Sequence, residues 1–276
     1  MRRLYLSFLT LFLTLYATGQ DLASASGGLL ARMWRPSHSS VLFGAGSTNQ
    51  LDSYLSPIEY NGPQFSVMVE STRALSRWQT ESTGWSFQSL LDINLHTSQT
   101  KAAGARYLGG DINYDAAFHH NWYGVLTPRL TLFAGPQAGI SLGGLYSTRA
   151  GNNPANAHLN LHLSVSVGAC YAFYIKRFPI SVNYQADLPL IGAAFSPNYG
   201  QSYYEMWQKG GYDHNIVGTH IGNAFSLRQM LTASFHIGSR TSLTIGYLGD
   251  IRQAQLNGLK QHQYGHGGLI GWTRKF

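Results

Sequence analysis

The stretch that decides the fold is Leu-Asn-Leu-His-Leu-Ser-Val-Ser-Val, residues 159–167. Apolar and polar side chains alternate along it without a break. Because successive side chains of a β-strand point to opposite faces, one face is aliphatic and the other carries Asn160, His162, Ser164 and Ser166. The pattern predicts a strand that separates an apolar environment from a polar one.

The same alternation recurs along the chain, most clearly at 84–97, 112–119, 178–190 and 242–252. Short turns are expected near 78–84, 121–128, 175–178 and 238–240. Longer links are expected at 49–62, 98–104, 147–156, 191–224 and 253–262. Short and long connections alternate, which favours an antiparallel up-and-down order of about 10 strands. The link 191–224 is long enough to hold another hairpin, which gives 12 strands as the alternative.

The predicted strands are too long and too weakly charged for a soluble sandwich. They run to about 13–18 residues, whereas strands of soluble proteins average about 5–6. Charged residues make up 11% of the chain, against about 25% in soluble domains. The polar faces contain Asn, Gln, Ser, His and Asp but almost no Lys or Glu. Apolar-out, polar-in strands indicate a transmembrane β-barrel, a closed structure that leaves no backbone edge in lipid.

The first 19 residues have the features of a secretory signal peptide. Arg2 and Arg3 precede an apolar segment at 4–16, and Ala17-Thr18-Gly19 offers small residues for cleavage. We therefore expect a signal peptide at 1–19 and a barrel domain at 20–276 that carries the long external loop 191–224. The expected location is the outer membrane of a Gram-negative bacterium, with the lipid bilayer as the main partner.

Charge and cysteine content exclude several functions. The net charge is +7, or about +5 once the two arginines of the signal are removed, and no basic run interleaves with aromatics, so no nucleic-acid partner is expected. A single cysteine, Cys170, excludes an intrachain disulfide framework. The eleven histidines are not grouped in a convincing ligand set, and we expect neither a metal nor a cofactor.

The chain ends in "GLIGWTRKF" (268–276), and its terminal Phe276 closes an alternating strand. This ending resembles the signal read by the barrel-assembly machinery, which is therefore an expected partner during biogenesis. Three further motifs, "LSPIEYNGP" (55–63), "NNPANAHLNL" (152–161) and "FSPNYGQSYYEMW" (195–207), resemble a family of uncharacterised Bacteroidetes-type outer-membrane proteins. The resemblance implies an outer-membrane barrel of unassigned, porin-like role and carries over no catalytic residue.

Two His-x-Ser pairs, His96/Ser98 and His162/Ser164, are the candidate catalytic residues. Side chains two apart on a strand share a face, so each histidine could activate its serine. A lipid hydrolase with such a pair in the barrel wall is the alternative function. Its dyad must face lipid, however, and these pairs have the phase of the lumen. A non-enzymatic barrel is therefore preferred.

Charged residues in the lumenal phase form the second candidate site. We expect a network of hydrogen bonds and ion pairs that plugs a small barrel, with a polar solute pathway or a proton-sensitive pore as the alternative. Its predicted members are Glu70, Asp92, Asp115, Asp187, Arg228, Asp250 and Arg252.

The segment 195–207 crowds aromatic side chains into the longest external loop. Phe195, Tyr199, Tyr203, Tyr204 and Trp207 either fold inward as a lid over the barrel mouth or form an exposed binding platform. We expect the lid. Together these features predict a narrow or plugged channel, or a component of an envelope complex whose protein partner the sequence does not reveal.

Overall fold

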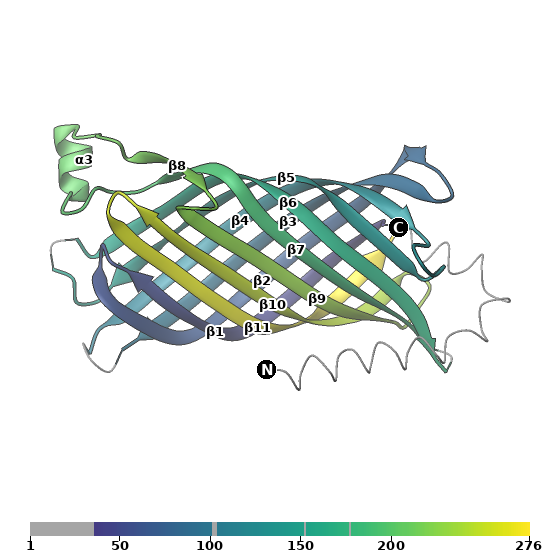
Figure 1. The fold of residues 1–276 in the computed structure, drawn as a ribbon. Helices are drawn as coiled ribbons and strands as arrows, with labels where there is room; N and C mark the ends of the chain where they lie inside the picture. The colour runs from purple at the N-terminus through teal and green to yellow at the C-terminus, as the bar shows by residue number, and fades with distance from the viewer. Residues whose placement is uncertain (1–35, 101–103, 152, 177) are drawn as a thin grey trace.

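The computed structural model describes residues 36–100, 104–151, 153–176 and 178–276; the predicted signal peptide lies outside these ranges. Strands make up most of the described chain, which also contains one short helix (Figure 1). Their bounds are β1 (His38–Asp52), β2 (Ser56–Gln79), β3 (Thr83–Gln99), β4 (Arg106–Tyr123), β5 (Leu130–Ser147), β6 (Ala155–Ile175), β7 (Phe178–Phe195), α3 (Tyr203–Lys209), β8 (Ile216–His220), β9 (Ala224–His236), β10 (Thr241–Leu256) and β11 (Leu259–Lys275).

Ten of these strands close into an antiparallel up-and-down barrel, and β8 is an additional short strand. Neighbours in the chain are neighbours in the sheet from β1 to β7 and from β9 to β11, and β1 pairs with β11. β7 pairs with β6 on one edge and with β9 and β8 on the other. The expectation of ten strands is confirmed, and the alternative of twelve is wrong.

The two ends of the barrel differ. Both ends of the described chain lie at one end of the barrel, which we call the turn end; the opposite end, which we call the loop end, carries α3 and the segment 196–223 (Figure 1). Long links predicted at 49–62 and 253–262 are wrong, because β1, β2, β10 and β11 continue through them into tight turns. At one of these turns Asn257 and Gly258 both have positive φ, 49° and 76°, as a two-residue hairpin turn requires.

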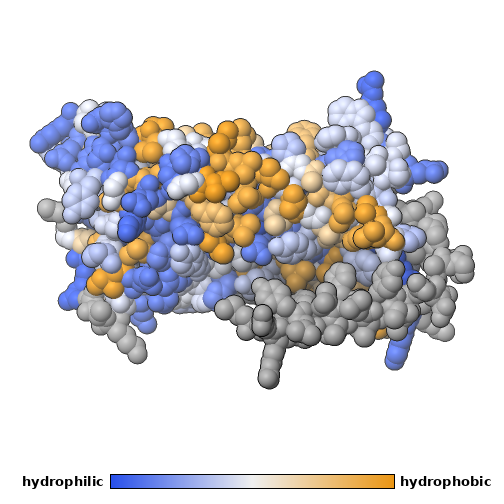
Figure 2. Space-filling view, viewed as in Figure 1, coloured by the Kyte–Doolittle hydropathy of each residue, from blue (hydrophilic) through white to orange (hydrophobic). Residues whose placement is uncertain are grey.

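The outer face of the barrel is apolar and the inner face is polar. In the stretch 159–167, Leu161 is 58% exposed while Ser166 is fully buried. A belt of such apolar side chains crosses the middle of the molecule, and hydrophilic residues gather at the loop end (Figure 2). Exposing this belt to water would be unfavourable, and a lipid bilayer removes the cost. The predicted orientation of the two faces is confirmed.

Among the residues that the structure describes, no helix combines the length and the apolar character needed to cross a membrane.

Candidate functional site

Three of the cavities in the lumen fall into two groups, with a layer of buried side chains between the groups. At the loop end, a cavity of about 130 Å³, which we call the vestibule, adjoins a middle chamber of about 50 Å³. At the turn end lies a chamber of about 110 Å³. Vestibule and middle chamber share Ser141, Asn160, Ser226 and Arg252 in their walls. The turn-end chamber shares none of these, so the layer between them divides the lumen.

The polar half of this layer is a pair of glutamines that meet across the lumen. Gln88 on β3 donates to the Oε1 of Gln185 on β7 at 3.0 Å, and Gln185 donates back to the Oε1 of Gln88 at 2.9 Å. Gln185 also donates to Ser166 and Asp187. Buried amides that satisfy one another in this way are stable and rigid. These bonds tie opposite walls of the barrel together.

The apolar half of the layer consists of buried side chains that project inward from neighbouring strands. Met230 is directly opposite Gln185 in the ladder, and Leu90 is the next inward residue after Gln88. We call the two glutamines together with this apolar cluster the barrier. The apolar members of the barrier are Leu42, Met68, Leu90, Met230, Leu248 and Leu269.

The sequence analysis missed the apolar half of the barrier, although a signal was present. Leu90 stands between Gln88 and Asp92 in the polar phase, and Met68 stands between Ser66 and Glu70. An apolar residue inside a run of lumenal polar residues marks a place where the lumen is dry.

Ion pairs lie on the loop side of the barrier. Arg228 on β9 contacts Asp115 of β4 at 2.8 Å and Asp187 of β7 at 2.9 Å. Arg252 on β10 contacts Asp250 at 2.5 Å and lies 3.9 Å from Asp111. Each guanidinium therefore faces two carboxylates, which compensates the cost of burying these charges.

All seven members of the predicted lumen network face inward, but the structure does not bring them into one site. Glu70 lies in the wall of the turn-end chamber, where His38 and Gln88 hydrogen-bond to it at 3.2 Å and 2.8 Å. Asp92 is 0% exposed and accepts a hydrogen bond from Asn94 at 2.7 Å. The remaining five, which lie on the loop side, are Asp115, Asp187, Arg228, Asp250 and Arg252.

Asp52 and Asp111 are two further lumenal carboxylates that the sequence analysis did not select. Asp52 on β1 accepts hydrogen bonds from Asn156 at 2.7 Å and His158 at 3.1 Å, both on β6. Asp111 accepts from Gln263 at 3.3 Å. Asp52 was missed because its segment was expected to be a loop, whereas Asp111 continues the inward phase of Asn113 and Asp115.

Both predicted His-x-Ser pairs face the lumen, and neither makes a hydrogen bond between its members within the described residues. His162 instead contacts Asp115 at 3.2 Å, and the buried Ser164 hydroxyl has no hydrogen-bond partner among them. The Ser98 hydroxyl donates to Gln50 at 3.3 Å. In neither of these two pairs could the histidine deprotonate its own serine in this arrangement.

The aromatic residues of 195–207 divide into an inward and an outward group. Tyr203 reaches into the mouth, where it donates to Asn156 Oδ1 at 2.8 Å and accepts from the Ala157 N–H at 2.7 Å. Phe195 lies beside it, with ring centroids 6.3 Å apart. Tyr199, Tyr204 and Trp207 are exposed instead.

Tyr54, in the turn between β1 and β2, holds the other side of this segment. Its hydroxyl donates to the Gln201 carbonyl at 3.0 Å, and its ring makes an edge contact with Tyr203. Burial raises the pKa of Tyr54 to about 12 and also raises that of Tyr203. Both phenols therefore stay protonated and keep donating at physiological pH.

Helix α3 is fixed by its own cap. The Ser202 hydroxyl accepts from the Glu205 N–H at 3.2 Å, and the Glu205 carboxylate accepts from the Ser202 N–H at 2.9 Å. This reciprocal pair is a capping box. The two hydrogen bonds from Ser202 lower the pKa of Glu205. No group of three His, Cys, Asp or Glu side chains that could hold a metal ion occurs in the described part of the chain.

Comparisons with known proteins give a family and distant likenesses in fold. The transport unit of the autotransporter AIDA-I from Escherichia coli is 10% identical over 95% of this chain and 97% of that one, with a TM-score of 0.47. The outer membrane protease OmpT from Escherichia coli is 7% identical over 87% and 97%, also at 0.47. The translocator domain of the autotransporter NalP from Neisseria meningitidis is 12% identical over 88% of each chain, at 0.40.

These likenesses are too distant to indicate an activity, and no curated protein matches the sequence. A family described as "Protein of unknown function (DUF3316)" matches residues 4–276. With nearly its whole length matched, the chain belongs to this family of proteins of unknown function.

Proposed function

We propose that the protein is a non-enzymatic barrel of the Gram-negative outer membrane whose lumen is closed at rest. The apolar belt and the closed, edge-paired wall support the location. The barrier carries the rest of the proposal, because it places two reciprocally bonded glutamines and six buried apolar side chains between the vestibule and the turn-end chamber. This construction favours a plugged channel or a surface-binding component over an open pore.

A solute that crossed the barrel would have to break the Gln88–Gln185 pair. It would also have to displace Met68 or Leu90, whose side chains are 1% and 2% exposed. Leaving one buried amide without its partner costs about 1–3 kcal/mol, and several such groups lie in series here. Passage therefore needs a rearrangement of the barrier, for which a ligand or a partner protein is the natural cause.

Single-channel recording in planar bilayers tests the closed lumen. We expect the wild-type barrel to show no steady ohmic steps, and the variant Met68→Ala/Gln88→Ala/Leu90→Ala/Gln185→Ala, which truncates both halves of the barrier, to show them. A matched control removes the hydrogen bond between Tyr184 and Gln229, which joins β7 to β9 on the outer face at 3.1 Å. The control Tyr184→Phe/Gln229→Ala should stay silent. Steady ohmic steps from the wild type would overturn the proposal.

The lipid hydrolase receives less support, since His162 is engaged with Asp115 and faces the lumen. We expect the refolded barrel to release no fatty acid from phospholipid or lipopolysaccharide. Release that His162→Ala abolishes, while His96→Ala does not, would restore the enzymatic alternative. The assembly machinery remains a proposed partner: Phe276 directly follows the end of β11 and is exposed, which leaves it accessible for recognition.

A further inference from the structure

The barrel wall is interrupted near the loop end between β7 and β9. Their pairing stops at Asp187 and Arg228. Beyond this point β7 pairs with β8, starting at Ile191 and His220, whereas β9 stays with β10 up to Ala224. In the described ladder, the facing edges of β7 at 188–190 and of β9 at 224–227 have no strand partner. We call this place the side split.

Specific residues on both sides of the side split fix its geometry. Pro189 has no N–H to donate, and the register of β6 and β7 shifts beside it. On the other side, Asn223 fixes the turn between β8 and β9. Its Oδ1 accepts from the His220 N–H at 2.8 Å, its Nδ2 donates to the Gly218 carbonyl at 2.9 Å, and its own carbonyl accepts from Gln255 at 2.8 Å.

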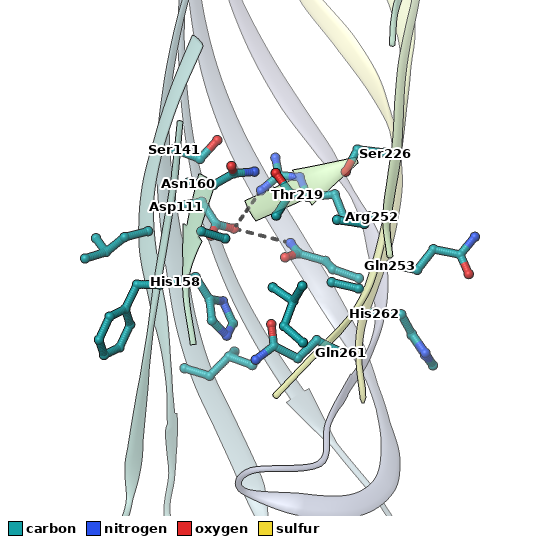
Figure 3. Close-up of a pocket in the computed structure, with 18 of the residues that line it drawn as sticks. Asp111, Ser141, His158, Asn160, Thr219, Ser226, Arg252, Gln253, Gln261 and His262 are labelled. Carbon is teal, nitrogen blue, oxygen red and sulfur yellow. Dashed lines mark hydrogen bonds and ion pairs between the residues drawn. The ribbon is translucent and has the colours of Figure 1, made fainter. Parts of the chain in front are cut away.

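The vestibule lies directly behind the side split. Ala194 and Thr219 line it from the β7–β8 side, and Ser226, Arg252 and Ala254 line it from the β9–β10 side. Figure 3 shows Thr219, Ser226 and Arg252 around this cavity. The cavity is therefore bounded by both borders of the interruption.

The side split also lies at the border of the apolar belt. Ile191 is 57% exposed and its ladder neighbour Leu163 is 54% exposed. On β10 the outward side chain changes from Ile251 to Gln253 at this height. The outer leaflet of a bilayer therefore reaches the split. Unpartnered backbone groups cost several kcal/mol each in hydrocarbon, so such an interruption is unfavourable unless something covers it.

The vestibule itself indicates the chemistry of what binds. Arg252 is already matched by Asp250 and faces Asp111, so an anionic guest would be left without a counter-charge. Gln50 and Asn160 line the vestibule, and the Gln50 Nε2 and the Asn160 Oδ1 are buried atoms without a hydrogen-bond partner within the described ranges. Rotation of these two amides would turn one donor and one acceptor toward a guest, and this pair suits neutral hydroxyl groups.

We propose that the side split is a lateral binding site for an amphiphile with a neutral, hydroxylated head group. The head group lies in the vestibule against Gln50 and Asn160, and the apolar chain passes between β7 and β9 toward lipid beside Ile191. This inference rests on the proposed membrane location but does not require the closed barrier.

Photolabelling tests the site. The barrel chain in lipid nanodiscs is exposed to an octyl glucoside that carries a diazirine in its alkyl chain, and adducts are mapped by mass spectrometry. We expect adducts concentrated at 188–191 and 216–227. Excess octyl glucoside should suppress them, whereas glucose, which lacks the tail, and octyl sulfate, which has a charged head, should not.

Vestibule-filling variants sharpen the test. Ser226→Trp and Ala194→Trp fill the cavity from its two sides and should each lower labelling at the split roughly tenfold. Ser234→Trp is the matched control, since Ser234 faces inward on the same strand but lines the turn-end chamber. Heat-modifiable gel migration shows which variants fold. If neither filling variant folds, the competition experiment with the wild-type barrel alone tests the lateral site.

Adducts spread evenly around the belt, or equal suppression by octyl sulfate, would overturn the lateral site. A conducting wild-type barrel with adducts still confined to the split would overturn only the closed lumen. The two proposals therefore fail separately.

Discussion

The barrier and the vestibule lie in one lumen but differ in how far their buried polar groups are hydrogen-bonded. At the barrier, Gln88 and Gln185 satisfy each other, and apolar side chains fill the remaining width. At the vestibule, Gln50 and Asn160 keep an unpaired atom among the described contacts, and the wall of this cavity is interrupted between β7 and β9. Complete pairing closes a lumen, whereas incomplete pairing beside a cavity leaves capacity for a guest.

The largest effect should come from breaking the ion pairs next to the barrier. Arg228→Leu leaves Asp115 and Asp187 buried without their cation, and we expect a loss of about 3–5 kcal/mol in the free energy of unfolding. Urea unfolding in detergent micelles, followed by tryptophan fluorescence, measures it. Lys260→Leu removes an exposed cation at the loop end and should stay within about 0.5 kcal/mol. Equal losses from both variants would mean that the buried ion pairs stabilise the barrel no more than an exposed charge does.

The next effect concerns the apolar half of the barrier. Met68→Ala opens a cavity in a dry layer and should lower the free energy of unfolding by about 2–5 kcal/mol. Val69→Ala, one residue along β2, changes a side chain on the outer face that is 39% exposed, and lipid can fill the space it leaves. We expect the Val69 variant to lose clearly less in the same unfolding experiment. A reversed order would show that the layer is not packed.

A smaller contrast separates two lumenal histidines. His119 hydrogen-bonds to Ser166 at 2.9 Å, and His119→Leu should cost about 1–3 kcal/mol. His96 is buried, and neither of its ring nitrogens has a hydrogen-bond partner among the described residues. His96→Leu should therefore leave stability unchanged or raise it. Thermal unfolding of the two variants side by side checks this, and a larger loss at His96 would show that it has a partner after all.

The smallest effect is the pH dependence of the segment that carries α3. Because the folded-state pKa of Glu205 is lowered, its contribution to the cap is present above the ordinary carboxyl pKa. It is lost as the pH falls through the lowered value. Hydrogen exchange of 203–209 should therefore speed up on acidification, beyond the intrinsic change with pH. Glu205→Gln keeps a capping side chain that does not titrate and should remove this dependence.

The wall of the barrel was predictable because one face of each strand meets lipid and the other does not, which imprints a period of two on the sequence. The tight turn at Asn257-Gly258 was also readable, since Asn-Gly is a strong hairpin signal, but the polar outward residues around it were taken for a loop. Those residues are polar because the strands continue beyond the apolar belt.

The candidate site was less predictable. The sequence placed Asp115, Asp187 and Arg228 on the inner face, but which of them meet depends on strand tilt and register across the lumen. Gln88 and Gln185 are 97 positions apart, and no local pattern links them. The capping box of α3 was readable from Ser202 and Glu205, whereas β8 forms only because β7 leaves an edge free beside it.

The pairing of β1 with β11 has a consequence for how the molecule is made. These strands pair along the whole length of β1, from His38 with Lys275 to Asp52 with Gln261. One edge of the first strand therefore stays unpaired until the last strand has reached it. Closing a loop of nearly the entire chain makes folding slow and exposes a pairing-competent edge meanwhile. We expect a factor that covers the free edge of β1 until β11 arrives to speed the closure of this barrel.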